Sequence, residues 1–281
     1  KIVDADTNRY GRRALGSAAP YKKEDAGYNA VLMMDRARAD AQKNKAGDDP
    51  VKAYDLPETK AYFAQMDKYM KKFSKQKEAV ELAYNAAIVR YQAKQFKQAV
   101  IDFRALKTNY PNNQYILLIS RMLAQSLLES EELDESQKEF EWLLKQYTEV
   151  KATRNDSMAK IIRTSIAAVL FQKADKAVKN GQYEQGAVAY LDLVKHYPKE
   201  SFSDKAVFEA GTAYEKANNY DKAAQTFMMI PKNYGSSPLT IKGILRAAMA
   251  YKKAGKPEQA AQTFLFITNN FEKDSMAFAA I

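Results

Sequence analysis

Apolar residues recur at helical spacing along most of this chain of 281 residues. In the N-terminal part the pattern predicts two helices. The first covers residues 25–46 and ends where Gly47 and Pro50 follow, and the second covers residues 58–77 and begins directly after Pro57. The apolar stripes that predict them are Tyr28, Val31, Leu32 and Ala39 in the first helix, and Tyr62, Met66, Tyr69 and Phe73 in the second.

From about residue 80 the chain repeats itself. Five aromatic residues anchor the repeat at intervals of 37, 50, 37 and 37 positions: Phe103, Phe140, Tyr190, Phe227 and Phe264. Small residues lie four positions before each anchor (Ala99, Ser136, Gly186, Ala223 and Ala260) and sixteen positions before it (Ala87, Ala124, Ala174, Gly211 and Ala248). Another aromatic residue lies seven positions after each anchor, at Tyr110, Tyr147, Tyr197, Tyr234 and Phe271. A period of this length is typical of a repeat architecture.

Each period contains what a pair of packed helices needs. A small residue in each helix lets the two backbones approach closely, and the aromatic anchor one turn later fills the space beside that contact. A single hairpin of this kind cannot bury both of its faces, so neighbouring hairpins must stack. The pattern therefore predicts an all-α fold, an α-solenoid of helical hairpins with an N-terminal helical extension.

The same pattern gives the expected domain boundaries. Residues 1–21 lack periodicity and are predicted to be an extended tail, and residues 22–79 an N-terminal helical segment. The array then covers residues 80–281, with units at about 80–116, 117–160, 161–203, 204–240 and 241–277 and the start of a sixth at 278. Because a repeat array needs a polar terminal unit, we expect the natural chain to continue beyond Ile281. Lys1 indicates a processed or excised chain.

One interval between anchors is longer than the others by 13 residues, which fall in residues 148–160. Such an insertion either lengthens a helix or projects a loop, and loops on repeat arrays often serve in binding. A longer second helix with no special role is the alternative.

The repeat resembles the tetratricopeptide repeat (TPR) family over residues 80–281. The match is best at residues 207–214, Tyr220, Ala223 and Phe227, and continues through the next unit at Ala247, Ala248, Tyr251, Ala260 and Phe264. This chain departs from the family in lacking a tryptophan near the start of each first helix, and its units are longer than the family's ~34 residues. The resemblance implies a right-handed superhelix that binds other proteins.

The links between units resemble one subclass of the family. They read Tyr-Pro-Asn at residues 110–112, Tyr-Pro-Lys-Glu-Ser at 197–201 and Tyr-Gly-Ser-Ser-Pro at 234–238. Links of this kind are similar to those of bacterial envelope TPR proteins, such as the lipoprotein subunit of the outer-membrane β-barrel assembly machinery and the periplasmic coordinator that works with Tol–Pal. The resemblance implies a periplasmic or outer-membrane-associated protein, with the cytoplasm as the alternative.

The family geometry also implies which side chains face a concave groove. These are Tyr84, Ile88 and Tyr91, then Arg121 and Gln125, Phe171 and Asp175, Phe208 and Thr212, and Leu245 and Met249. An aromatic and apolar groove with scattered polar groups would suit an extended peptide or a partner helix. Tyr84 and Ile88 stand where family members that grip chaperone tails have lysine and asparagine, so that ligand is disfavoured.

The amino-acid composition limits the kinds of catalytic and metal-binding site that the chain can form. The chain has no cysteine and one histidine, which excludes disulfides, thiolate nucleophiles and zinc–thiolate sites. His196 lies in a link between units without an evident catalytic partner, and we interpret it as an exposed residue. We therefore expect no catalytic residues, no metal site and no cofactor. The longest apolar runs are far shorter than the ~20 residues of a membrane span.

The net charge of +10 alternates along the chain. Residues 58–111 carry +6, whereas residues 112–150 carry −5. A nucleic-acid binder usually presents a continuous basic stripe, so nucleic acid is disfavoured as a partner. One basic helix face could contact phosphate or an anionic lipid surface, although a solvated helix face is the commoner explanation: Lys68, Lys71, Lys72, Lys75 and Lys77.

Together these features predict a non-enzymatic scaffold or adaptor of a bacterial envelope complex, which binds a partner peptide or helix in its concave groove. Two alternatives belong to other classes of function. The chain would be a basic module that binds nucleic acid or anionic lipid, or a regulatory fragment of a larger protein whose catalytic domain lies elsewhere.

Overall fold

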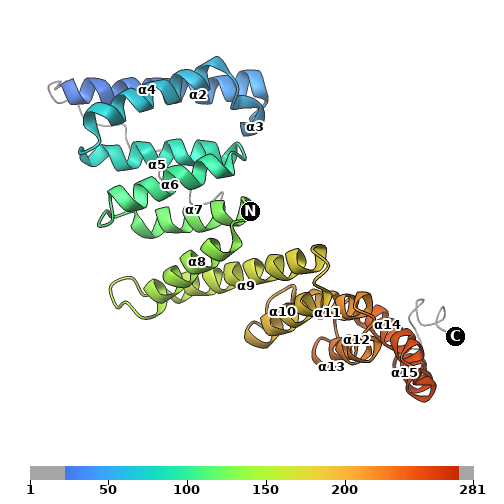
Figure 1. Cartoon of the computed structure of the whole chain (residues 1–281). Coiled ribbons are helices and arrows are strands. Elements are labelled where there is room, and N and C mark those ends of the chain that lie inside the picture. The colour runs from blue at the N-terminus through green and yellow to red at the C-terminus, as the bar shows by residue number, and fades with distance from the viewer. Residues whose placement is uncertain (1–22, 272–281) are drawn as a thin grey trace. The chain divides into compact units, whose positions relative to one another are not determined.

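The structure, a computed structural model, describes residues 23–271. Every regular element in that range is an α-helix, which confirms the predicted all-α class. The helices form two compact units, residues 1–139 and residues 140–281, and the boundary lies inside α8 (Figure 1). The predicted tail at residues 1–21 and the predicted start of a sixth unit at 278 lie outside the described residues.

Within the described residues, the first helices of the first unit are α2 (Lys23–Ala46), α3 (Pro50–Ala53) and α4 (Pro57–Phe73). α2 packs along α4, as Figure 1 shows at the blue end of the chain. Their shared core consists of Val31, Tyr62, Met66 and Tyr69, together with Ala79, Leu82 and Ala86 of the next helix. The predicted helix at residues 58–77 is corrected at its end, because α4 stops at Phe73 and a turn precedes the next helix.

A stacked guanidinium joins this N-terminal segment to the repeats that follow. The guanidinium carbon of Arg90 lies 4.2 Å from the centre of the Phe63 ring on α4. The same guanidinium forms an ion pair with Asp102, and both side chains are largely buried. Because a cation over an aromatic face and an ion pair act on one group, the arginine links three helices at once.

The repeats of the first unit are α5 (Lys77–Gln92), α6 (Phe96–Asn109), α7 (Ile116–Glu129) and the beginning of α8 (Leu133–Thr148). α5 packs on α6 and α6 on α7, and the anchor Phe103 is completely buried between them. At the small position of α8, the Ser136 hydroxyl donates to the Ala124 carbonyl oxygen at 2.8 Å. This contact shows how close the two small positions of a hairpin come.

The second unit continues with α9 (Asp156–Lys179), α10 (Tyr183–His196), α11 (Ser203–Lys216), α12 (Tyr220–Phe227), α13 (Met229–Asn233), α14 (Thr240–Lys253) and α15 (Pro257–Asn270). Each helix packs on the next, and α12 also packs on α14. α12 and α13 together form the second helix of their hairpin. The interruption at Met228 has a local cause, since Pro231 has no N–H to donate to the carbonyl four residues earlier.

All five hairpins turn in the same way. Nine positions before each anchor stands one residue with positive φ: Lys94, Glu131, Gly181, Asn218 and Gly255. In each turn the N–H of this residue donates to a carbonyl three residues earlier, and the next N–H donates to a carbonyl five residues earlier. This is the Schellman ending, which satisfies the last carbonyl groups of a helix. The backbone, and not the residue type, is what the five turns share.

Ten of the 13 inserted residues lengthen the first helix of the third hairpin. α9 has 24 residues, whereas the equivalent helices α11 and α14 have 14 each. A short loop precedes it, and the side chain of Asn155 caps the helix by accepting from the Met158 N–H at 3.0 Å. The alternative of a longer second helix is therefore wrong for most of the insertion, because α8 has only 16 residues.

Candidate partner-binding surfaces

In the first unit, the predicted groove residues lie on the first helices α5 and α7. Tyr84 and Ile88 retain only 7% and 8% of their surface and belong to the hydrophobic core of the unit. Tyr91, Arg121 and Gln125 are half-buried. The core thus uses part of the predicted set for packing and leaves the remainder at the surface.

Tyr91 and Gln125 show that α5 and α7 present adjacent side chains. Burial raises the pKa of Tyr91 to about 12, and the negative charge of Glu129 acts in the same direction. A hydrogen bond from Gln125 partly opposes this effect on the pKa. The Gln125 amide also donates to the Glu129 carboxylate at 3.0 Å. These contacts form a polar, tyrosine-bearing patch across the two first helices.

Near the other end of α5 the same two helices enclose a small depression. Its free volume is about 10 Å³, which admits one water-sized group. The residues that line it are Glu81, Tyr84, Asn85, Tyr115 and Leu118. Only Tyr84 of these was among the predicted groove residues. The other four lie outside the positions that define the repeat, so the sequence pattern did not distinguish them.

In the second unit, three of the predicted residues, Phe171, Asp175 and Phe208, are engaged in packing. Phe171 contacts the rings of Tyr190 and Phe202 edge-on, at centroid distances of 5.1 and 5.8 Å. Asp175 accepts a hydrogen bond from the Tyr190 hydroxyl, and burial together with this carboxylate raises the pKa of Tyr190. Phe208 is buried at 8% exposure.

The remaining predicted residues of this unit are more accessible. The hydroxyl of Thr212 donates to the Phe208 carbonyl at 3.0 Å and is half-buried. Leu245 is half-buried, and Met249 is exposed at 53%. The structure therefore brings the predicted side chains onto first helices as expected, with exposure that varies from buried core to open surface. Whether they bind a partner stays a prediction.

A feature that was not predicted is a row of cations over first-helix aromatic rings. The ammonium of Lys205 lies 5.4 Å from the centre of the Phe171 ring, and that of Lys242 lies 5.0 Å from the centre of Phe208. The Arg246 guanidinium also lies over Phe208, at 5.7 Å, and forms an ion pair with Glu215. In this unit the chain itself covers these aromatic faces.

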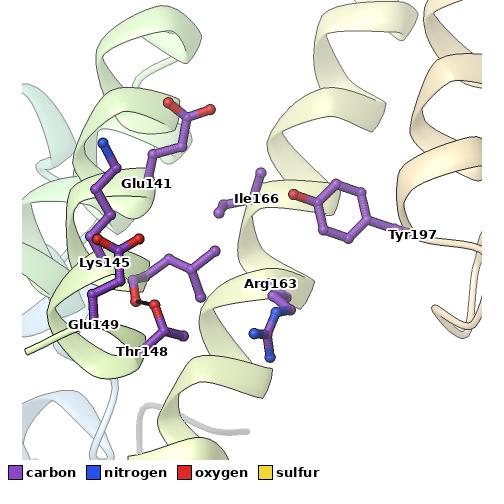
Figure 2. Close-up of a pocket in the computed structure, with 8 residues that line it drawn as sticks. Glu141, Lys145, Thr148, Glu149, Arg163, Ile166 and Tyr197 are labelled. Carbon is purple, nitrogen blue, oxygen red and sulfur yellow. Dashed lines mark hydrogen bonds between the residues drawn. The ribbon is translucent and has the colours of Figure 1, made fainter. Parts of the chain in front are cut away.

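A larger cleft opens in the second unit where the insertion lies. Its volume is about 340 Å³ and it is bounded by the end of α8, by α9 and by the link after α10. Figure 2 shows the side chains of α8 facing Ile166 and Arg163 of α9, with the Tyr197 hydroxyl directed toward Ile166. The lining residues are Glu141, Leu144, Lys145, Thr148, Glu149, Arg163, Ile166 and Tyr197.

Tyr197 differs from the tyrosines at equivalent positions in other links. The Tyr110 hydroxyl donates to the Ser74 carbonyl, and the Tyr234 hydroxyl donates to the Pro198 carbonyl at 3.1 Å, so each ties one link to the previous one. Within residues 23–271 the Tyr197 hydroxyl has no such bond. Burial and the nearby Glu141 raise its pKa, and Arg163 lowers it. The insertion was expected to serve contacts, but this cleft could not be foreseen from it.

The five lysines of the predicted basic face are all exposed. They do not share one helix as expected: Lys68, Lys71 and Lys72 lie on α4, Lys75 lies in the turn, and Lys77 begins α5. In the part of the chain that the structure describes, none of them forms an ion pair. Their charge is therefore available to an external anion.

His196 is exposed, and its Nδ1 lies 2.9 Å from the Asp192 carbonyl oxygen of its own helix. Among residues 23–271 no group of three or more His, Cys, Asp and Glu side chains is placed to hold a metal ion. In the same range no helix combines the length and the apolar character that crossing a bilayer requires.

Two family models, both of the tetratricopeptide repeat, match the sequence at residues 81–113 and 171–238. These two segments are similar to tetratricopeptide repeats. The first TPR match covers α5, α6 and the link that follows, and the second extends from within α9 to the link before α14. The predicted TPR resemblance is confirmed for these segments. No curated protein matches the chain.

Solved structures that resemble the chain do so at low sequence identity. The chain resembles the MamA protein at 13% identity and a TM-score of 0.42, covering 72% of this chain and 96% of MamA. It resembles a tetratricopeptide repeat protein from Parabacteroides merdae at 13% identity and a TM-score of 0.40, covering 86% of this chain and 80% of that protein. A third structure, BtubC from P. vanneervenii, has 14% identity and a TM-score of 0.36, with 85% and 88% covered.

Proposed function

We propose that this chain is a non-enzymatic scaffold that binds other proteins through the first-helix faces of its repeats. The observation that carries the proposal is the surface of α5 and α7, where tyrosine, glutamate and amide side chains surround an open depression. Tyr84 also packs in the core of the unit, but a core does not require the half-buried Glu81 and Asn85. Aromatic and polar side chains together are the types that recognise peptide segments. An extended segment or a helix of the partner would lie across these two helices.

The proposal can be tested by changing half-buried groups of this face. Changing Tyr91 and Tyr115 to Ser and Gln125 to Ala should remove specific partners in affinity capture followed by mass spectrometry. Val188→Ser is a matched control, because Val188 is 57% exposed on the second helix α10. If the face variant retains the same partners as the control while circular dichroism stays helical, the groove is not the binding surface.

We also propose that the partners belong to a bacterial envelope complex, in the periplasm or at the outer membrane. The support is the sequence of the links and their geometry, in which Ser203 donates to the Tyr197 carbonyl at 2.7 Å and a link tyrosine reaches the previous link. Fractionation of the native organism tests the compartment. Recovery of the protein in the cytoplasmic fraction would contradict the proposal and favour the cytoplasmic alternative.

The exposed lysines around the end of α4 support a second candidate function, which is peripheral contact with an anionic membrane surface. Each basic residue near such a surface contributes about 1 kcal/mol at moderate ionic strength. Vesicles with and without phosphatidylserine provide the assay. Changing the five lysines to Glu should abolish sedimentation with anionic vesicles, and persistence of binding in that variant at high salt would exclude this function.

A further inference from the structure

Tyrosines at one position of the links join neighbouring links by a hydrogen bond. Tyr110 and Tyr234 lie seven positions after their anchors, and each hydroxyl donates to a carbonyl 36 residues earlier. The acceptors are the carbonyl groups of Ser74 and Pro198. A main-chain carbonyl is therefore the group that a tyrosine at this position binds.

The link after α10 lacks this bond. Its tyrosine is Tyr197, and the residue equivalent to Ser74 and Pro198 is Thr148, which is 36 residues earlier once the 13 inserted residues are left out of the count. Thr148 and Tyr197 both line the cleft of about 340 Å³, and in the part of the chain that the structure describes no hydrogen bond joins them. The cleft thus opens between two residues whose counterparts are hydrogen bonded in the links of Tyr110 and Tyr234.

The inserted loop folds back on α8 and does not close the cleft. In the link after α10 the Ser203 hydroxyl donates to the Tyr197 carbonyl at 2.7 Å. The residue of α9 equivalent to Ser203, 24 positions before its anchor, is Ile166, which has no group to donate. The Tyr147 carbonyl accepts instead from the Asn155 N–H, at 2.9 Å. An apolar side chain therefore lines the cleft where another link has a polar contact.

Two donor groups lie on the side of the cleft opposite α8, as Figure 2 shows. Arg163 lies on the part of α9 that the insertion adds, is exposed, and forms no ion pair within residues 23–271. Burial and Glu141 raise the pKa of the Tyr197 hydroxyl, whereas Arg163 lowers it, so the guanidinium acts at the position of the hydroxyl. Because both groups donate hydrogen bonds, they favour an acceptor, and a carboxylate most strongly.

The charge around the cleft also favours an acidic ligand. Residues 144–166, which contain the insertion, carry a net charge of +3. Glu141 and Glu149 lie on α8, across the cleft from Arg163 (Figure 2), so they direct an incoming carboxylate toward the α9 side. The cleft volume of about 340 Å³ lies within the range of ~300–1,000 Å³ that is typical of ligand sites.

We propose that this cleft binds an extended acidic segment of a partner protein. A main-chain carbonyl of the segment accepts from the Tyr197 hydroxyl, as the Pro198 carbonyl does from Tyr234. Because carbonyl groups inside a helix already accept bonds from their own chain, the segment is extended where it meets the cleft. An aspartate or glutamate beside that carbonyl pairs with Arg163, and its methylene groups contact Ile166. The inference adds a second surface to the proposed scaffold and rests on that function only in taking the ligand to be a protein.

The test measures the binding of labelled twelve-residue peptides to the full chain by fluorescence anisotropy, at about 150 mM salt. One peptide alternates serine with glutamate, and two matched peptides carry glutamine or lysine in place of glutamate. Arg163→Gln and Tyr197→Phe each remove one donor group. Lys160→Gln is the matched control for charge, because Lys160 is exposed on the same added part of α9 and does not line the cleft. Tyr234→Phe is the matched control for the hydroxyl, since that hydroxyl already donates within the chain.

We expect the glutamate peptide to bind at least about tenfold more tightly than the glutamine peptide. Arg163→Gln should weaken binding of the glutamate peptide about fivefold and that of the glutamine peptide less than about twofold. Tyr197→Phe should weaken binding of both peptides about threefold, because the hydroxyl contacts the main chain. The two control variants should change each affinity less than about twofold. Circular dichroism checks that each variant is folded, and either donor variant decides the test if the other does not fold.

Equal binding of the glutamate and glutamine peptides, or tighter binding of the lysine peptide, would overturn the inference. A loss of affinity in Lys160→Gln as large as that in Arg163→Gln would also overturn it, because the net charge of +10 would then explain the attraction. Unchanged affinity in both Arg163→Gln and Tyr197→Phe would exclude the cleft as the binding site. If the peptides fail while affinity capture still depends on Tyr91 and Tyr115, the scaffold function stands and only the cleft site is lost.

Discussion

Gly211 shows how one position sets the distance between the two helices of a hairpin. It lies on α11, and a Cβ atom placed there would come within 2.6 Å of the Phe227 ring. Phe227 is the fully buried anchor of the same hairpin. The requirement for a small residue sixteen positions before an anchor therefore comes from direct contact with the anchor ring.

We expect Gly211→Ala to lower the free energy of unfolding by about 1–3 kcal/mol, because the ring must shift in a packed interior. Urea denaturation measures the change. Adding Phe227→Leu shortens the side chain that the new methyl meets, so the double variant should lose less than the sum of the two single changes. Strict additivity would show that the two side chains do not compete for the same space.

Tyr91 provides a pH-dependent prediction. Its folded-state pKa of about 12 exceeds the unfolded value of 10.0. The folded state therefore holds a proton that the unfolded state loses first, and the stability from this group is complete below pH 10 and is lost as the pH rises toward 12. Tyr91→Phe should show a smaller loss of stability over this interval. In an absorbance titration at 295 nm, the Tyr91→Phe variant should lack one tyrosine that ionises only at high pH.

At the scale of the element, the five turns have one backbone and different residues. Gly181 and Gly255 adopt positive φ without strain, whereas Lys94, Glu131 and Asn218 carry a Cβ there. Sequence inspection finds the glycines as turn signals but gives no reason to expect a left-handed lysine or glutamate. The packing of the neighbouring helices imposes that conformation, and the backbone of the non-glycine residue is therefore strained.

Glu131→Gly should therefore raise the free energy of unfolding by about 0.5–1 kcal/mol, and Gly181→Ala should lower it by about 1 kcal/mol. Thermal or urea unfolding of the two variants provides the comparison. Glu131 is exposed, so lost packing does not complicate the result. Destabilisation by Glu131→Gly would mean that its side chain contributes more than its backbone costs.

The links give a matched pair of substitutions. Tyr234→Phe removes a hydroxyl that donates to the Pro198 carbonyl, and we expect it to cost about 0.5–1.5 kcal/mol. Tyr197→Phe removes a hydroxyl that lines the cleft, and it should leave stability nearly unchanged. Urea denaturation of both variants tests the difference. An equal loss in both would show that Tyr197 also ties its link in solution.

At the scale of the whole molecule, the fold was predictable and the site only in part. The two small residues and the aromatic anchor of each period predict the helix pairs, because these residues form the close contact between the two helices of a hairpin. The exposure of the groove residues was not predictable. Tyr84 and Phe208 face the groove in family geometry, yet neighbouring hairpins bury them to 7% and 8% exposure. The packing of one hairpin on the next decides which groove side chains remain exposed. The residues of a single period do not predict this packing.

The two units also predict how the chain responds to local damage. In stacked repeats each hairpin contacts mainly its neighbours, so a defect spreads over a limited distance. Phe227→Ala should reduce hydrogen-exchange protection in α10–α14 and leave that of α4–α6 close to the wild type. Mass spectrometry of the exchanged peptides reads both regions in one experiment. A uniform loss of protection would indicate that the chain unfolds as a single cooperative body.

The shared turn has a consequence for how such a chain changes length. Glu131 lies 37 residues after Lys94, and the same interval separates Gly181, Asn218 and Gly255. A genetic crossover between any two of these turns joins identical backbone geometries, so it adds or removes whole hairpins without interrupting a helix. The residue with positive φ thus marks the position at which whole repeats can be added to or removed from an array of this kind.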